Sequence, residues 1–297
     1  MRPFRFALVS LVWGCLVGGA GCALPVRQPP QVAVAVARDA GPAERPKEGE
    51  SAGASELPEL RAEFEAERVR GTIALFDTKD GVLRCSDLGG CAQAVVPAST
   101  FKIPSSIIAL ETGVVEGSDT RLPWDGKAHS VPEWNQDMTF RKALQVSCVP
   151  CYQAIARKVG EARMREWVTK LGFGNRDISG GVDRFWLGGA LRISPLEQID
   201  FLRRFDGDKL PISSRTADIV RDIMTLDVTD SYVLRGKTGY IAPPEVPSEL
   251  GWFVGWLELG ERRVYFATLL TGHEPGVELR PARRQVTERV LRARGYL

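Results

Sequence analysis

Three short motifs lie far apart in this chain, and a fold that brings them together forms one chemical site. They are Ser99-Thr-Phe-Lys102, Ser147-Cys-Val149 and Lys237-Thr-Gly239. The first precedes an apolar segment, residues 107–110, that predicts a buried helix. Side chains three residues apart share a helix face, so Lys102 can reach Ser99 near the positive end of the helix dipole. This pairing indicates a nucleophile and its base for acyl transfer, although a capping serine beside a solvated lysine is the alternative for this motif alone.

The pattern of apolar residues predicts strands towards both ends of the chain and helices between them. Strands are expected at 72–76, 232–240, 251–257 and 264–270. Helices are expected at 154–159 and 161–171, each ended by a glycine, and from the capping box that begins at Ser194. Charged helices are expected near 57–68 and 277–294. This order predicts an α+β fold, with one antiparallel sheet built from both chain ends, flanking terminal helices and an all-helical insert over about 98–225.

Composition excludes several classes of partner. The chain has 297 residues, 44% of them hydrophobic, which suits one or two domains with a substantial core. Its net charge of +2 favours no partner, and no basic stripe indicates nucleic acid. The only histidines, His129 and His273, stand on separate loop-like stretches, so no metal site is predicted.

The N-terminus has the pattern of an export signal. Arg2 and Arg5 precede an apolar run over 6–16 and the small residues at 18–21, which predicts a signal peptide over 1–23. Cys22 follows the small residues, so lipid attachment to Cys22 is an alternative to ordinary cleavage. Such a lipid is the one membrane contact that the sequence indicates. Residues 24–56 predict a flexible linker rich in proline and alanine, followed by a catalytic domain over 57–297. The protein is therefore expected to be exported to the periplasm, either free or anchored as a lipoprotein.

Four further cysteines fall in two close pairs. Cys85 and Cys91 flank a turn-like stretch, and an exported chain meets an oxidising compartment, so we predict a disulfide between them. Cys148 and Cys151 stand at the start of a helix, where their spacing disfavours a bond. We predict two small buried hydrophobic side chains there, with pairing as the less favoured alternative.

The chain resembles the class D, or OXA-type, serine β-lactamases. The resemblance covers about residue 69 to the C-terminus, and its motifs follow the family's order: Val96-Pro-Ala-Ser-Thr-Phe-Lys-Ile-Pro104, Trp124-Asp-Gly126, Trp134-Asn135, Phe173-Gly-Asn175, Phe185-Trp-Leu187, Leu191-Arg-Ile-Ser194, Lys237-Thr-Gly239 and Gly251-Trp-Phe-Val-Gly-Trp256. Ser147-Cys-Val149 distinguishes it from class A enzymes, which carry Ser-Asp-Asn. The resemblance implies a β-lactamase/transpeptidase-like fold and hydrolysis of a β-lactam amide by water, without a metal or organic cofactor. A D-alanyl-D-alanine carboxypeptidase and a β-lactam sensor domain are the alternative functions.

The resemblance also implies the roles of the first motif. Ser99 forms the acyl-enzyme, and the backbone N–H groups of Ser99 and Tyr240 form the oxyanion hole. An ordinary lysine, with a pKa of about 10.4, is protonated at neutral pH, but burial lowers a lysine pKa. Lys102 is thus expected to react with CO2 from bicarbonate and become N6-carboxylysine, the general base. The indole N–H of Trp186 is expected to hold the carbamate, with a plain core role as its alternative.

The other motifs are expected to bind substrate and move a proton. By resemblance, Ser147 bridges the lysines and relays a proton to the β-lactam nitrogen, while Lys237 keeps the local field positive. Thr238 and an arginine hold the substrate carboxylate by charge-assisted hydrogen bonds. Helical phase favours Arg283, whereas Arg280 better preserves the distance from the preceding strands. The expected substrate-binding residues are Val149, Leu187, Lys237, Thr238, Gly239 and Arg283.

Overall fold

The computed structural model describes residues 53–297. The signal peptide predicted at 1–23, with Cys22, and nearly all of the predicted linker lie outside the described residues. Within residues 53–297, no helix is both long and apolar enough to span a bilayer.

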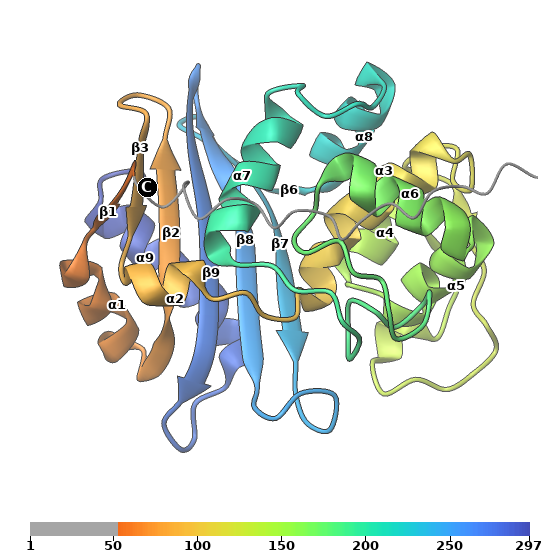
Figure 1. Cartoon of the computed structure of the whole chain (residues 1–297), viewed down its shortest axis with the longest axis horizontal. Coiled ribbons are helices and arrows are strands. Elements are labelled where there is room, and N and C mark those ends of the chain that lie inside the picture. The colour runs from red at the N-terminus through yellow and green to blue at the C-terminus, as the bar shows by residue number, and fades with distance from the viewer. Residues whose placement is uncertain (1–52) are drawn as a thin grey trace, which may run out of the picture. The chain divides into compact units, whose positions relative to one another are not determined.

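One sheet is built from the two ends of the described chain, as predicted. Its order is β1-β3-β2-β9-β8-β7-β6 (Figure 1). The strands are β1 (Ala54–Glu56), β2 (Val69–Asp77), β3 (Val82–Cys85), β6 (Thr225–Val228), β7 (Val233–Ile241), β8 (Leu250–Leu259) and β9 (Arg262–His273). Neighbouring strands are antiparallel except β1, which pairs with β3 in parallel.

Strand β1 corrects two predictions, because the sheet is not purely antiparallel and folded structure begins inside the segment predicted as linker. The strand aligns Ala54 with Leu83 and Glu56 with Cys85. The amide of Leu57 then donates to the Cys85 carbonyl at 2.7 Å. An edge strand offers unpaired backbone groups, and a short extended segment satisfies them whatever its composition.

The two faces of the sheet support two apolar cores. On β2, Ile73 and Leu75 pack into one core, with residues of α1 (Arg61–Ala66) and α9 (Leu279–Ala293). Ala74 and Phe76 point to the opposite face and pack into the larger core, which includes α7 (Pro195–Asp206). Figure 1 shows α7 crossing one face of the sheet, with α9 behind the other. The predicted flanking terminal helices are therefore present.

The middle of the chain is mostly helical, and the apolar side chains of its helices belong to the larger core. Its helices are α3 (Lys102–Glu111), α4 (Phe140–Gln145), α5 (Val149–Val159), α6 (Glu161–Leu171), α7 and α8 (Ser214–Ile223), with the 3-10 turns η3 (Ala98–Phe101) and η4 (Pro132–Trp134). The capping box of α7 is confirmed, since the Ser194 amide donates to Glu197 Oε2 at 2.7 Å. The short elements η2 (Pro58–Leu60) and α2 (Leu88–Ala92) lie near the N-terminal strands.

The insert is not entirely helical, which corrects the prediction. Strands β4 (Arg121–Leu122) and β5 (Met138–Thr139) pair antiparallel in a two-stranded sheet. They close the base of a polar loop in which the Asp137 carboxylate accepts the Trp124 amide at 2.8 Å. Strands this short carry too little periodicity to be predicted from sequence.

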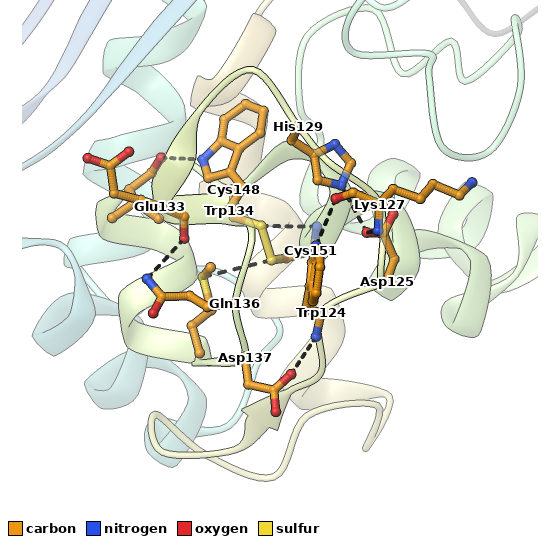
Figure 2. Close-up of a disulfide and its surroundings, with 12 residues drawn as sticks. Trp124, Asp125, Lys127, His129, Glu133, Trp134, Gln136, Asp137, Cys148 and Cys151 are labelled. Carbon is orange, nitrogen blue, oxygen red and sulfur yellow. Dashed lines mark hydrogen bonds and ion pairs between the residues drawn. A yellow bond between two sulfur atoms is a disulfide. The ribbon is translucent and has the colours of Figure 1, made fainter.

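Both cysteine predictions were wrong. Cys148 and Cys151 form a disulfide (Figure 2), whereas Cys85 and Cys91 are buried free thiols. Cys148 is the N-cap of α5, with φ −55° and ψ 105°, so the argument from helical spacing does not apply to it. Its Cα lies 5.4 Å from that of Cys151, within the range of disulfides. The Cys91 thiol instead lies 3.2 Å from the Thr72 hydroxyl and donates to the Ile73 carbonyl at 3.4 Å.

Candidate active site

Ser99 lies in the 3-10 turn η3, immediately before α3, and Lys102 is the first residue of that helix. Ala98, the residue before Ser99, has φ +49°. Such a conformation costs free energy in a non-glycine residue and persists only where surrounding contacts fix it. The Thr100 hydroxyl donates to the Pro97 carbonyl at 2.8 Å and accepts from Gln198 Nε2 at 2.8 Å. Helix α7 therefore helps to hold the turn that presents Ser99.

Lys102 contacts Ser99 directly. Its Nζ donates to Ser99 Oγ at 2.8 Å, and the side chain is only 1% exposed. The ring of Tyr152 also lies near this amine, with 5.2 Å from Nζ to the ring centroid. Burial lowers the pKa of Lys102 to about 7. A large share of this amine is thus uncharged at neutral pH, as a base or a nucleophile towards CO2 requires.

Trp186 lies beside the first motif with an unused hydrogen-bond donor. Its ring stacks on Phe101, the residue before Lys102, with centroids 5.4 Å apart. The side chain is 1% exposed, and its Nε1 has no acceptor within the described part of the chain. A buried donor without an acceptor costs free energy, so this indole is suited to an acceptor that is added later.

Strand β7 brings the third motif to the same place. Lys237 is buried, and its Nζ donates to the Thr238 carbonyl at 2.9 Å. Burial, followed by the positive charges of Lys102 and Arg283, holds the pKa of Lys237 well below its ordinary value. The positive charge of Lys102 therefore acts on Lys237, which places the two amines in the same part of the site.

Gly239 explains how β7 approaches the nucleophile turn so closely. A Cβ at this position would lie 3.0 Å from Trp252 Cβ, 3.1 Å from the Pro97 carbonyl oxygen and 3.2 Å from Thr100 Cγ2. The Trp252 indole in turn donates to the Val96 carbonyl at 2.9 Å. Glycine therefore allows the close approach, because a Cβ here would require its neighbours in η3 and β8 to shift by a few tenths of an ångström.

The two candidate arginines occupy different positions. Arg283 Nη1 donates to the Gly239 carbonyl at 2.5 Å, and burial lowers its pKa to about 10. Arg280 is exposed and lies over the ring of Tyr240, 4.1 Å from the centroid. Tyr240 is aligned with Gly251 in the β7–β8 ladder. Arg283 is therefore the arginine that touches the Lys-Thr-Gly motif.

The second motif forms the turn between α4 and α5. Ser147 is half-buried, has φ +55° and donates its amide to the Leu144 carbonyl at 3.1 Å. Among the described residues, the lysine side chains bond to Ser99 and Thr238, so the hydrogen-bonded bridge expected through Ser147 is absent. Lys237 is turned along its own strand and bonds to Thr238 instead. Val149 begins α5, and Leu187 packs half-buried against the larger core.

Three supporting residues were not predicted. The Ser106 hydroxyl donates to the Lys102 carbonyl at 2.7 Å and lies 2.7 Å from the Tyr152 hydroxyl. Gln198 is fully buried and reaches Thr100 across 98 positions of sequence. The spacing of Ser106 from Lys102 was a usable signal, because residues four apart share a helix face. Nothing local indicated the partner of Gln198.

The described residues contain no cluster of three or more His, Cys, Asp or Glu side chains that could hold a metal ion.

Comparison with known proteins identifies the family. The profile of the family "Penicillin binding protein transpeptidase domain" matches residues 75–293. The chain is 38% identical to β-lactamase OXA-10 of Pseudomonas aeruginosa, over 79% of this chain and 88% of that protein. It belongs to the class D β-lactamases. Another class D member, OXA-48 of Klebsiella pneumoniae, is 41% identical over 69% of this chain and 77% of its own.

A solved structure agrees. The crystal structure of the class D β-lactamase YbXI from Nostoc superposes with a TM-score of 0.76 at 41% identity, covering 80% of this chain and 99% of that one. The predicted β-lactamase/transpeptidase-like fold is thus confirmed. As a class D chain, this protein carries its Ser-x-x-Lys motif at Ser99 and Lys102, in the geometry described above.

Proposed function

We propose that this protein hydrolyses the amide bond of β-lactam antibiotics through an acyl-enzyme on Ser99. The observation that carries the proposal is the buried pair of Ser99 Oγ and Lys102 Nζ, 2.8 Å apart, in which the amine has a pKa of about 7. A base must lie within hydrogen-bond reach of the proton it takes and be unprotonated at working pH. Lys102 meets both conditions.

Acylation uses the first two motifs and the backbone of strand β7. Ser99 Oγ attacks the β-lactam carbonyl carbon as its proton passes to the base, and the backbone N–H groups of Ser99 and Tyr240 stabilise the oxyanion. The carbon–nitrogen bond then breaks, and Ser147 delivers a proton to the departing nitrogen. Water attacks the ester in the second half-reaction and releases Ser99.

Trp186 supports carboxylation of Lys102. In that reaction the neutral amine attacks CO2, a nitrogen–carbon bond forms and one proton is released. The carbamate would supply an oxygen base for acylation and deacylation. The buried Trp186 Nε1, which has no acceptor within residues 53–297, is suited to hold it.

Arg283, Thr238 and Lys237 supply the handle for the substrate carboxylate. They converge on β7, where Arg283 bonds to the Gly239 carbonyl and Lys237 to that of Thr238. A cationic, partly desolvated edge favours a carboxylate. Val149 and Leu187 would border the substrate on the apolar side.

We also propose export to the periplasm. The apolar run behind Arg2 and Arg5 supports a cleaved signal, with Cys22 as a lipid attachment point. The Cys148–Cys151 disulfide supports an oxidising compartment.

Stopped-flow kinetics with a chromogenic cephalosporin tests the function. We expect repeated turnover that increases with bicarbonate. Trp186→Phe keeps the stacking on Phe101 but removes the indole N–H, and should raise the bicarbonate concentration for half-maximal rate by about 10-fold or more. Trp124→Phe is the matched control, since that indole is 42% exposed and donates to the Lys127 carbonyl at 2.8 Å.

Three outcomes would contradict the proposal. A stable acyl adduct without turnover in bicarbonate would indicate a sensor domain instead. Faster cleavage of D-alanyl-D-alanine peptides than of β-lactams would indicate a carboxypeptidase. A turnover rate that changes neither with bicarbonate nor with Trp186→Phe would contradict a carbamate on Lys102 as the general base.

A further inference from the structure

The Cys148–Cys151 disulfide follows directly on Ser147. The disulfide ties the N-cap of α5 to its first turn. Cys148 is fully buried, and its sulfur accepts the Cys151 amide at 3.2 Å. The covalent link therefore fixes the backbone that leaves Ser147 towards the helix.

Ser147 needs such support because of its backbone conformation. Its φ of +55° lies in the left-handed region, which a residue with a side chain adopts only when its surroundings impose it. On the other side of the turn, the Trp134 indole donates to the Val146 carbonyl at 3.1 Å (Figure 2). The Cys148 amide donates to the Ala143 carbonyl at 2.9 Å. The serine is thus held by hydrogen bonds before it and by a disulfide after it.

The disulfide also borders a cavity through Cys151. A cavity of about 210 Å³ lies between α5 and the loop before β5, lined by Trp124, Trp134, Pro150, Cys151, Ala154 and Ile155 among others. Cys151 is half-buried and borders this cavity, whereas Cys148 is fully buried and does not. In Figure 2 the disulfide lies between the two tryptophans. A small neutral dithiol can therefore reach the Cys151 sulfur.

We propose that the Cys148–Cys151 disulfide is a positioning element for the Ser147 hydroxyl in acylation, and that thiol–disulfide exchange through this cavity weakens that positioning. The proposal rests on the proposed role of Ser147. Neither cysteine touches the reacting atoms. They act by restricting the turn that aims the serine, and a misplacement of about 1 Å can slow an enzyme by roughly 10²-fold.

Reduction by dithiothreitol follows from the geometry. One thiolate of the reagent attacks Cys151 Sγ, the protein disulfide breaks, and Cys148 leaves as a thiolate at the N-terminus of α5, where the helix dipole favours negative charge. The second reagent thiolate attacks the mixed disulfide and releases the Cys151 thiolate. The reagent gives up two electrons and becomes a cyclic disulfide, while the protein thiolates take up protons from water.

The test measures the rate at which a β-lactam acylates Ser99 in the full chain, by stopped flow and mass spectrometry. We expect reduction to slow acylation by about 10-fold with little change in substrate affinity, and reoxidation by oxidised glutathione to restore it. Alkylation must show two newly released thiols at 148 and 151. An acylation rate unchanged by complete reduction would overturn the proposal. The experiment measures acylation separately from deacylation. A protein that acylates but does not deacylate would therefore contradict the proposed hydrolysis, but not the proposed role of the disulfide.

Two variants separate positioning from general loosening of the fold. Ser147→Ala should acylate slowly, and reduction of the disulfide should not slow this variant further. The effects of two changes are not additive when one group acts through the other. A further 10-fold loss in this variant would overturn the proposed route through Ser147. Ala154→Phe fills the cavity and should slow reduction several-fold while the oxidised protein keeps its acylation rate. If wild type and Ala154→Phe were reduced at equal rates, access of the reagent through this cavity would be ruled out.

Discussion

At the scale of single residues, Lys102 is deeply buried, and no carboxylate among residues 53–297 pairs with it. The side chain is 1% exposed, and its hydrogen bond goes to Ser99 Oγ, 2.8 Å away. Burial alone lowers its pKa to about 7, because a charged amine loses hydration there without gaining a counter-ion. The feature that prepares the amine for catalysis thus reduces the stability of the fold.

The lowered pKa of buried Lys102 predicts how the free energy of unfolding depends on pH in CO2-free buffer. Between about pH 7 and 10.5, the unfolded chain keeps a proton on Lys102 that the folded chain has lost, so the free energy of unfolding rises with pH. Below about pH 7 both states are protonated and the dependence on this group ends. Lys102→Met should therefore be more stable than wild type near pH 7, by about 3–5 kcal/mol. The advantage should shrink towards pH 10.5.

Urea unfolding at unit steps from pH 7 to 10 measures this difference. Subtracting the two curves largely cancels the contribution of Lys237, which changes stability in the same direction in both proteins. Parallel curves would contradict a Lys102 that is neutral because it is buried.

The sequence predicted the residues whose chemistry demands a particular type. Ser99 and Lys102 were predicted because the Ser-x-x-Lys motif carries a nucleophile and its base, and helical phase favoured Arg283 over Arg280. Gln198 was not predicted, because its partner Thr100 lies 98 positions away and a buried amide can serve many acceptors. The predicted hydrogen bonds from Ser147 to the two lysines are not found, because the Lys237 side chain turns to the Thr238 carbonyl beside it. Its rotamer could not be predicted from the sequence.

At the scale of elements, the site depends on the approach of β7 to the turn η3. Gly239 allows this approach, since its missing Cβ would lie 3.1 Å from the Pro97 carbonyl oxygen and 3.2 Å from Thr100 Cγ2. The backbone N–H groups of Ser99 and Tyr240, which we propose as the oxyanion donors, lie on these two elements. Their separation is therefore fixed by a backbone contact.

Gly239→Ala should separate the two donors. We expect acylation to fall by about 10²-fold, since small displacements of catalytic groups are costly, with a loss of about 1–3 kcal/mol in the free energy of unfolding from overpacking. Burst kinetics and urea unfolding measure the two effects. The matched control is Gly117→Ala, whose Cβ would meet only the end of the Arg215 side chain at 3.7 Å. A variant that keeps its acylation rate would show that the contact does not set the oxyanion hole.

Element boundaries also explain the wrong cysteine predictions. The sequence placed Cys148 and Cys151 at the start of a helix, but the N-cap conformation of Cys148 was not predicted. An N-cap residue lies outside helical geometry, so spacing rules for helices fail for a pair that spans it. The pairing depended on ψ at one residue, which periodicity does not determine.

At the scale of the whole molecule, one sheet separates two cores and gathers its strands from both ends of the described chain. Apolar runs along β2, β8 and β9 predicted this sheet, because a strand between two cores buries side chains on both faces. Strand β1 escaped prediction. Its residues Ala54–Glu56 have no apolar pattern, and they are ordered by the free edge of β3.

Two shortened chains test the contribution of β1. A chain that begins at Gly53 should match the full chain in kcat and in melting temperature. A chain that begins at Leu57 exposes the β3 edge and loses the contact of Glu56 with Arg61, 2.9 Å from carboxylate to guanidinium. It should melt about 2–8 °C lower, for a loss of roughly 1–2 kcal/mol in a domain of this size. Its kcat should stay unchanged, because β1 lies at the opposite edge of the sheet from β7 and the nucleophile turn. Equal melting temperatures would mean that β1 adds nothing to the fold, whereas a fall in kcat alone would mean that the sheet transmits changes at its far edge to the site.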